Sequence, residues 1–552
     1  MRRQPIEFMS KIMRCSVFLL CAAILVACGQ HKSRPTGQTE LGAEGPVGRE
    51  LTRGLPGEPR TLDPQLADDT YSSQVIRDLY EGLTSEDRSG KVVPGVASSW
   101  TVDPTGTTYT FQLREEARWS NGDRIFANEF VEGLRRAVDP KTASGSAALL
   151  SIIKGASDIT AGRKKPTDLR VTAISASSIQ IELERPAPYL LEILSQPIAA
   201  PFHAQNNLLP ASSGEMRAHV VTNGPYILKA RVPGSFIELE RNIRYWDAAH
   251  VAIERVRYVN AESEATEVRE YAAGQLDMTF TIPTPDVKRL AEKYGNQVQI
   301  APILATQYLA FNLSEPPMRD NRDLRQALSM AVDRDFIAEY VIEGVTPAYS
   351  FVAKGINGYV SPEYAWASWS RERRLDYARR LFLHAGYSER NPLRLKLYFS
   401  RDEGLQRLMV AVAGSWKQNL GVESELISDE FRVFLAGRRD KKRWDVARIG
   451  WTADYDDPTS FLDVFASGSS ENDGSYLSPA FNESLNSAEM EPNGEKRTEL
   501  LRRAEQSLLD DYPIVPIYFY NSRRLVKPDI GGATTTPMNR TYTKQLFWRA
   551  PP

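Results

Sequence analysis

The first 28 residues restrict this chain more than any other segment, because they hold all three of its cysteines and a 13-residue apolar run. Four basic residues precede this run, which comprises residues 15–27 (CSVFLLCAAILVA) and is interrupted by a single serine. Such a run suits the core of a signal peptide and is shorter than the roughly 20 residues that a membrane-spanning helix needs. We therefore expect residues 1–27 to be an export signal rather than part of the folded body.

The run ends in Leu25-Val26-Ala27-Cys28, which is similar to a bacterial lipobox. In that motif the cysteine is lipidated through its sulfur and becomes the mature N-terminus, so Cys28 is the expected lipidation site. The alternative is an ordinary secretory signal that happens to contain a cysteine. Residues 28–49, rich in Gly, Gln, Ser, Thr, Pro and Glu, are expected to form a flexible stalk. No later apolar run has transmembrane length, so we expect the protein in the periplasm or cell envelope, anchored to the membrane by lipidated Cys28.

The composition of the body excludes several classes of protein. The 552 residues suggest about three domains, and 42% hydrophobic with 25% charged residues is typical of globular proteins. Residues 1–27 hold four basic residues and one acidic residue, so the remaining chain has 64 basic against 69 acidic residues. This balance gives no support for a nucleic-acid partner. Because no cysteine follows Cys28, the body has no disulfide, no cysteine nucleophile and no cysteine metal ligand.

Local periodicity predicts strands and helices interleaved along the chain. Residues 108–113 alternate Tyr, Phe and Leu with Thr and Gln, the pattern of a half-buried strand. After Asn321, apolar residues recur at i, i+3, i+4, i+7 and i+8, which predicts an amphipathic helix, and similar patterns predict helices around 375–385 and 500–508. Asn128 is expected to cap another helix, which Pro140 ends. The fold class is therefore α/β or α+β with several domains.

The common signatures of enzymes are missing. The sequence has no Walker loop, no G-x-G-x-x-G and no G-x-S-x-G, and none of its five histidines pair at zinc-ligand spacing. Carboxylates do cluster at Asp68 and Asp69 and again at Asp454, Asp456 and Asp457. A glycosidase could use such a pair, although acids in Gly- and Pro-containing loops usually serve turns and helix caps.

Blocks spread over nearly the whole body resemble one family in the same order. The blocks are 57–64 (GEPRTLDP), 78–83 (DLYEGL), 93–100 (VPGVASSW), 109–123 (YTFQLREEARWSNGD), 223–226 (NGPY), 241–247 (RNIRYWD), 311–313 (FNL) with 325–328 (RQAL) and 332–334 (VDR), and 448–462 (RIGWTADYDDPTSFL). Together they resemble bacterial extracellular solute-binding proteins of the peptide/nickel ABC transporter family (family 5), and most closely its oligopeptide-binding members.

The resemblance implies a ligand site around Asp454. A protein that accepts many peptides should contact what all peptides share, the main chain and the two charged ends. An α-amino group that leaves water needs a carboxylate, and the family places one at the position of Asp454. The alternative role of Asp454 is an Asx turn before Pro458. Trp451 would line the cleft or be a core residue, and Thr452, in place of a common cysteine, would contribute its backbone.

The remaining ligand-binding candidates also come from the resemblance. Arg448 matches a position suited to the peptide carboxylate, with a structural salt bridge as the alternative. Arg438 and Arg439 match positions that border side-chain pockets, although 438–443 (RRDKKR) also has the composition of a solvated loop. Phe431 matches an aromatic residue of those pockets, and Asp68 matches an acidic cleft residue.

The same resemblance implies an α/β fold of the periplasmic binding protein type II-like clamshell kind, with two lobes in three domains. Lobe I would comprise residues 50–80, 206–305 and 522–552, domain II would be inserted as 81–205, and lobe III would be 306–521. The protein would be a monomer, without cofactor or catalytic activity, that closes on an oligopeptide and delivers it to an ABC permease powered by separate ATPase subunits.

Some departures leave the ligand open. Gly145 and Ser146 stand where the oligopeptide binders have an aromatic residue, Arg439 stands in place of a familiar histidine, and 126–129 (FANE) replaces a usual Thr-Ala-x-Asp. A dipeptide, a cell-wall peptide, a nickel complex or haem is the alternative ligand within the family. A lipid-anchored hydrolase of peptides or peptidoglycan and a structural envelope lipoprotein are the alternatives from other classes.

Overall fold

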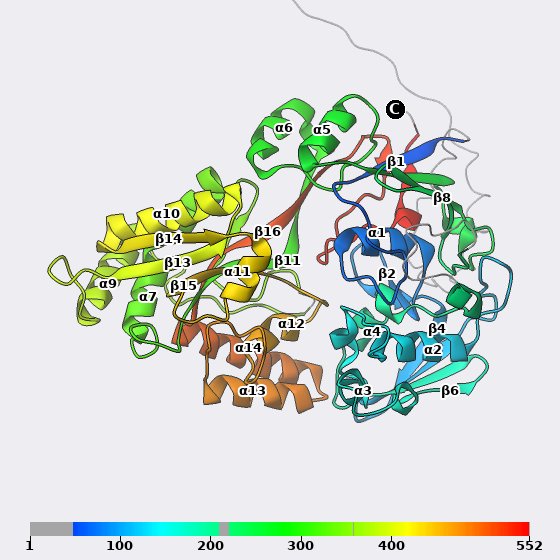
Figure 1. Ribbon diagram of the computed structural model, residues 1–552, viewed down its shortest axis with the longest axis horizontal. Coiled ribbons are helices and arrows are strands. Elements are labelled where there is room, and N and C mark those ends of the chain that lie inside the picture. The colour runs from blue at the N-terminus through cyan, green and yellow to red at the C-terminus, as the bar shows by residue number, and fades with distance from the viewer. Residues whose placement is uncertain (1–47, 209–219, 357, 551–552) are drawn as a thin grey trace, which may run out of the picture. The chain divides into compact units, whose positions relative to one another are not determined.

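The computed structural model describes residues 48–208, 220–356 and 358–550, all of which belong to one unit spanning residues 42–552. The export signal, Cys28 and nearly all of the predicted stalk lie outside the described residues. The described chain alternates strands and helices from Glu50 onward (Figure 1).

The first sheet combines the N-terminal strand with strands from the middle of the chain. Its order is β1 (Glu50–Leu55), β10 (Arg255–Asn260), β9 (Phe236–Arg241) and β8 (Tyr226–Val232). β1 runs parallel to β10, and the other pairs are antiparallel. Leu51 and Leu55 of β1 are fully buried, so packing as well as strand pairing holds the N-terminal strand in this sheet.

The second sheet is antiparallel throughout. Its order is β4 (Ala97–Val102), β5 (Thr108–Leu113), β7 (Ser178–Glu182) and β6 (Val171–Ser175). β5 confirms the strand predicted at 108–113, and its alternate residues Tyr109, Phe111 and Leu113 are buried.

Helix α2 (Ala127–Val138) packs on β6 and β7, and it shows one error in the prediction from sequence. The helix begins before Asn128, so Asn128 is not its cap. The backbone N–H of Phe126 instead donates to Glu129 Oε2 at 2.8 Å, and this carboxylate closes the first turn.

The third sheet is the largest, with the order β12 (Thr346–Pro347), β16 (Ile514–Leu525), β11 (Val298–Phe311), β15 (Val446–Thr452), β13 (Arg394–Ser400) and β14 (Glu423–Asp429). β15, β13 and β14 are mutually parallel, while β11 pairs antiparallel with both β15 and β16. The register between β11 and β16 is interrupted between Pro302 and Thr306. Apolar cores lie on both faces of this sheet, and the consecutive residues Tyr308 and Leu309 belong to different cores.

The helices predicted by periodicity are present around this sheet. Asn321 caps α7 (Arg322–Ala331), because its side chain accepts from the backbone N–H of Leu324 at 3.0 Å. α9 (Arg371–His384) and α14 (Gly494–Asp511) confirm the other two predicted helices, and α14 pairs with α13 (Pro479–Met490) (Figure 1).

The remaining α-helices are α1 (Thr70–Leu79), α3 (Ala156–Thr160), α4 (Leu190–Ile193), α5 (Glu264–Ala272), α6 (Val287–Tyr294), α8 (Arg334–Phe336), α10 (Glu403–Leu420), α11 (Phe431–Gly437) and α12 (Thr459–Leu462). Two short sheets pair β2 (Thr84–Glu86) with β3 (Val92–Pro94) and β17 (Ile530–Gly531) with β18 (Phe547–Trp548).

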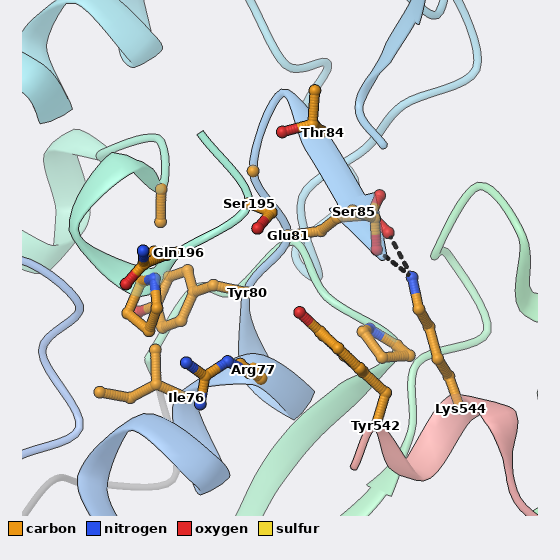
Figure 2. Close-up of a pocket in the computed structure, with 14 residues that line it drawn as sticks. Ile76, Arg77, Tyr80, Glu81, Thr84, Ser85, Ser195, Gln196, Tyr542 and Lys544 are labelled. Atoms are coloured by element: carbon orange, nitrogen blue, oxygen red, sulfur yellow. Dashed lines mark hydrogen bonds and ion pairs between the residues drawn. The ribbon is translucent and has the colours of Figure 1, made fainter. Parts of the chain in front are cut away.

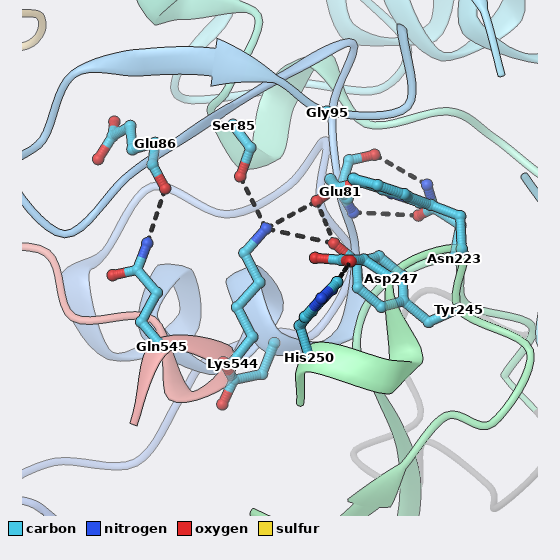
Figure 3. Close-up of polar contacts among 12 residues, drawn as sticks. Glu81, Ser85, Glu86, Gly95, Asn223, Tyr245, Asp247, His250, Lys544 and Gln545 are labelled. Atoms are coloured by element: carbon cyan, nitrogen blue, oxygen red, sulfur yellow. Dashed lines mark hydrogen bonds and ion pairs between the residues drawn. The ribbon is translucent and has the colours of Figure 1, made fainter. Parts of the chain in front are cut away.

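A short C-terminal segment, residues 540–544, supplies buried polar partners to residues 78–86. Lys544 Nζ lies 2.7 Å from Glu81 Oε1 and donates to Ser85 Oγ at 2.9 Å (Figure 3). Arg540 forms an ion pair with Glu86, and both side chains are buried. Since an unpaired buried charge is strongly destabilising, these contacts bind the two segments together.

Candidate ligand-binding site

Strand β15 and the loop after it position four of the predicted ligand-binding residues. Side chains alternate along a strand, so Arg448 and Thr452 lie on one face of β15 and Trp451 on the other. Trp451 is opposite Thr306 of β11, and Asp454 follows the end of the strand by two residues.

A cavity of about 220 Å³ lies beside this loop and includes both Asp454 and Trp451 in its wall. We call it the acidic cavity, because the carboxyl groups of Asp454, Asp463 and Glu471 line it and Arg185 is its one cationic lining residue among those described. Residues of two distant parts of the chain meet here, 148–189 and 451–471. Its volume suits one end of a peptide rather than a whole oligopeptide.

The backbone of Asp454 is fixed while its carboxyl remains available. Its N–H donates to Ser460 Oγ at 2.8 Å, and its carbonyl oxygen accepts from Gln196 Nε2 at 2.8 Å. The side chain is exposed, but it lines a recess in which protein displaces much of the surrounding water. This desolvation raises the pKa of Asp454 to about 6; the nearby carboxylate of Glu471 adds to the increase, and Arg540 opposes it.

Aromatic rings stiffen the wall of the acidic cavity. The rings of Tyr189 and Tyr455 stack with their centroids 4.3 Å apart and an interplanar angle of 7°. Trp451 Nε1 donates to the carbonyl oxygen of Ser460 at 2.6 Å, which ties strand β15 to helix α12 on the far side of the loop that carries Asp454. An ion pair of 2.8 Å between Arg185 and Glu489 also joins this wall to helix α13.

Arg448 belongs to a different cavity, of about 290 Å³, which we call the arginine cavity. Its lining includes Arg448, Arg523, Tyr518, Tyr520 and Asp402. Arg448 Nη2 donates to the hydroxyl of Tyr520 at 2.9 Å, and that hydroxyl donates to Gln307 Oε1 at 2.9 Å. This relay orients one edge of the Arg448 guanidinium.

The other predicted residues line neither cavity. Arg438 forms an ion pair of 2.7 Å with Asp473, and both side chains are mostly buried. A solvated loop at 438–443 would not predict such a buried contact. Asp68 forms an exposed ion pair with Arg60. Phe431, the first residue of α11, is 55% exposed, and Arg439 and Thr452 are exposed as well.

Several lining residues were not identified from the sequence. Arg185 and Tyr189 reach the acidic cavity from more than 250 positions away from Asp454, and no motif links the two segments. Asp463 directly follows the block 448–462 that carried the family resemblance, and Glu471 lies eight positions further on, but nothing in the pattern distinguishes them from loop residues. Arg523 lies three residues after the aromatic run 518–520, and no pattern in the sequence marks it as a ligand-binding residue.

A third cavity is too small for a ligand. It holds about 10 Å³, room for about one water molecule, and lies between Arg77, Tyr80 and Tyr542 (Figure 2). Burial lowers the pKa of Arg77 and raises that of Tyr542. In the part of the chain that the structure describes, no group of three or more His, Cys, Asp or Glu side chains is placed to hold a metal ion. Within that part, every helix is too short or too polar to cross a membrane.

Comparison with known proteins identifies the family. Residues 91–473 match the model of the bacterial extracellular solute-binding proteins, family 5 Middle. The periplasmic oligopeptide-binding protein OppA of Salmonella typhimurium is 37% identical over 534 residues, which cover 96% of this chain and 98% of that protein. The periplasmic murein peptide-binding protein MppA of Escherichia coli is 33% identical over 545 residues, which cover 97% of this chain and 99% of MppA.

Solved structures agree with the sequence comparison. The unliganded open form of the murein tripeptide-binding protein MppA superposes with a TM-score of 0.82 at 33% identity, covering 92% of this chain and 98% of MppA. Haemophilus influenzae OppA in complex with the peptide RPPGFSPFR gives a TM-score of 0.73 at 32% identity, covering 90% and 98% of the two chains. These relatives confirm the predicted α/β fold of the periplasmic binding protein type II-like class. The chain therefore belongs to the bacterial extracellular solute-binding proteins of family 5.

Proposed function

We propose that this protein is the substrate-binding lipoprotein of an ABC importer, which captures oligopeptides in the periplasm and delivers them to a membrane permease. One observation carries the proposal most directly. Asp454 lines a cavity of about 220 Å³, and its backbone is held by Ser460 and Gln196 while no hydrogen bond to its carboxyl is found among the described residues. A carboxylate so placed suits the α-amino group of a peptide. The relatives named for oligopeptide binding support this reading.

The two cavities suggest how the ends of a peptide are held. The amine would pair with Asp454 and pack beside Trp451, while the carboxylate would pair with Arg448, whose planar guanidinium suits bidentate contacts. Thr452 would contribute backbone groups. Arg438, Arg439, Phe431 and Asp68, which border neither cavity here, would approach the ligand only after closure.

Closure would bring together the three domains expected from the sequence. Lobe I would be residues 50–80, 206–305 and 522–552, domain II residues 81–205, and lobe III residues 306–521. The hydrogen bond from Gln196 to Asp454 and the ion pair between Arg185 and Glu489 join domain II to lobe III in this division. Binding would select the closed state through contacts that exist only there. No covalent chemistry is involved, and the protein would act as a monomer with separate permease and ATPase subunits.

The proposal includes membrane attachment through lipidated Cys28 after removal of residues 1–27. Residues 28–49 would then serve as the tether between the lipid and the binding domains. Radioactive or bio-orthogonal palmitate labelling of the expressed chain tests this part, with Cys28→Ser as the variant that should lose the label.

Peptide capture is tested with the chain from Gly29 onward, unfolded and refolded to remove carried-over ligand. Thermal unfolding is followed with pools of tri- to pentapeptides and with the same pools after N-acetylation. Free-amine peptides at a hundred times their dissociation constant should stabilise the fold by about 2.7 kcal/mol, and acetylated peptides much less. Asp454→Asn should abolish the shift, whereas Glu483→Gln, which changes an exposed carboxylate outside both cavities, should retain it. Equal shifts with free and acetylated peptides would refute the role of Asp454.

A further inference from the structure

The arginine cavity brings two guanidinium groups together without a carboxylate partner for either. Arg448 of β15 and Arg523 of β16 both line it, and both act electrostatically on the hydroxyl of Tyr518, which lines the same cavity. Among the described residues, no carboxylate lies within 4 Å of either guanidinium. Two partly buried cations that line one cavity and lack counter-charges are unusual.

Most of the donors on these two arginines are unused by the protein. Each guanidinium has five N–H groups. Arg448 uses Nη2 on Tyr520, and Arg523 uses Nη1 on the carbonyl oxygen of Glu343 at 3.2 Å. The Nε atoms of both residues are buried and have no hydrogen-bond partner among the described residues. Buried donors of this kind normally have an acceptor.

Nearby acids do not neutralise the pair. Asp402 lines the cavity, but its Oδ1 accepts from the backbone N–H of Leu405 at 2.9 Å and caps helix α10. Glu264 acts on Arg523 only from a distance beyond that of an ion pair. Desolvation lowers the pKa of Arg523, which shows that its position disfavours an isolated charge. An anionic ligand would relieve this cost.

We propose that Arg523 and Arg448 together bind two carboxylates of one ligand, so that the protein prefers peptides whose C-terminal residue is Asp or Glu. This inference rests on the proposed function. The terminal carboxylate would pair with Arg448, and the acidic side chain would pair with Arg523. The cavity of about 290 Å³ has room for one such residue.

The charge of the other cavity supports the same orientation of the ligand. The acidic cavity has three carboxyl groups and one arginine in its wall, whereas the arginine cavity has two arginines and one aspartate. A peptide with a free amine at one end and two carboxylates at the other matches this distribution of charge.

The test compares peptides that differ only in the charge of the last side chain. Isothermal titration calorimetry of the refolded chain from Gly29 onward uses pairs such as Ala-Ala-Glu and Ala-Ala-Gln, with matching tetra- and pentapeptides. The wild type should bind the Glu-ended peptides about tenfold more tightly, which corresponds to ~1.4 kcal/mol. Arg523→Gln should remove this difference and leave the affinity for Gln-ended peptides within about twofold.

Two further variants separate charge at this site from charge in general. Arg523→Lys keeps the charge without the planar fork and should retain part of the preference. Arg390→Gln removes the charge of an exposed arginine that lines neither cavity and should retain all of it. Equal wild-type affinities for the two peptides, or a preference that survives Arg523→Gln, would overturn the inference while leaving peptide binding intact. If Arg523→Gln does not fold, the wild-type comparison still decides. Absence of binding by every peptide would overturn the proposed function together with this preference.

Discussion

The pKa of Asp454 leads to a quantitative prediction for peptide binding between pH 5 and pH 7. Desolvation and the carboxylate of Glu471 raise this pKa, Arg540 lowers it, and the result is a value near 6 in the free protein. Only the ionised carboxylate pairs with a peptide amine. About nine-tenths of Asp454 is ionised at pH 7 and about one-tenth at pH 5. The peptide amine, with a pKa of about 8, stays protonated throughout this range. The apparent dissociation constant should therefore rise about tenfold as the pH falls from 7 to 5. An aspartate at its ordinary pKa of about 3.9 would give almost no change.

Calorimetric titration of one free-amine peptide without ionisable side chains, at half-unit steps of pH, measures this dependence. Asp463 lines the same cavity, and burial raises its pKa to about 7. The nearby carboxylates of Glu489 and Asp457 raise this pKa further, whereas Arg185 and Arg497 lower it. The Asp463→Asn variant therefore serves as the control, and it should keep the midpoint near 6. A flat profile, or a midpoint near 4 in both proteins, would refute the assignment of the amine to Asp454.

Two predictions concern stability. Asp457 and Arg497 form a bidentate ion pair, with N–O distances of 2.7 and 2.8 Å and about a tenth of each side chain exposed. Asp457→Asn should therefore lower the free energy of unfolding, measured in urea, by about 3 kcal/mol or more. A loss below about 0.5 kcal/mol would contradict the importance of the pair. Burial raises the pKa of Glu505 to about 8, although Tyr359 and two backbone N–H groups donate to its carboxyl. Because this folded-state pKa lies above the unfolded value, the stability it contributes is present at low pH and falls as pH rises toward 8. Glu505→Gln should therefore gain at least ~2 kcal/mol relative to the wild type between pH 5 and pH 9, and parallel stability curves in urea would count against a protonated Glu505.

Local patterns predicted individual elements well, because short-range forces determine them. The strand at 108–113 and the helix after Asn321 need only alternation, amphipathicity and a cap. The start of α2 was misplaced because Asn128 is a good cap by type, whereas the observed contact depends on the Glu129 carboxylate reaching back to Phe126. Residue type alone does not determine at which of several nearby positions a helix begins.

The sequence identified residues of the candidate site only where they lie together in one short segment. Asp454 and Trp451 lie in a contiguous block, and the structure brings both to one cavity. Tyr189 completes the same wall by stacking on Tyr455, a contact across more than 260 positions that no local pattern encodes. The run at 438–443 was ambiguous for a similar reason, because the partner of Arg438 is Asp473, a residue outside the run.

The contacts of residues 540–544 have a consequence for how the chain matures. Glu86 pairs with Arg540, Glu81 with Lys544, and Asp78 accepts from the backbone N–H of Thr543 at 3.2 Å. These acids are among the earliest residues of the described chain and their partners are among the latest. During synthesis the buried carboxyl groups of Glu81 and Glu86 therefore lack these cationic partners until residues 540–544 have been made. Complete folding of residues 78–86 therefore has to wait for residues 540–544, although more than 450 positions separate the two segments.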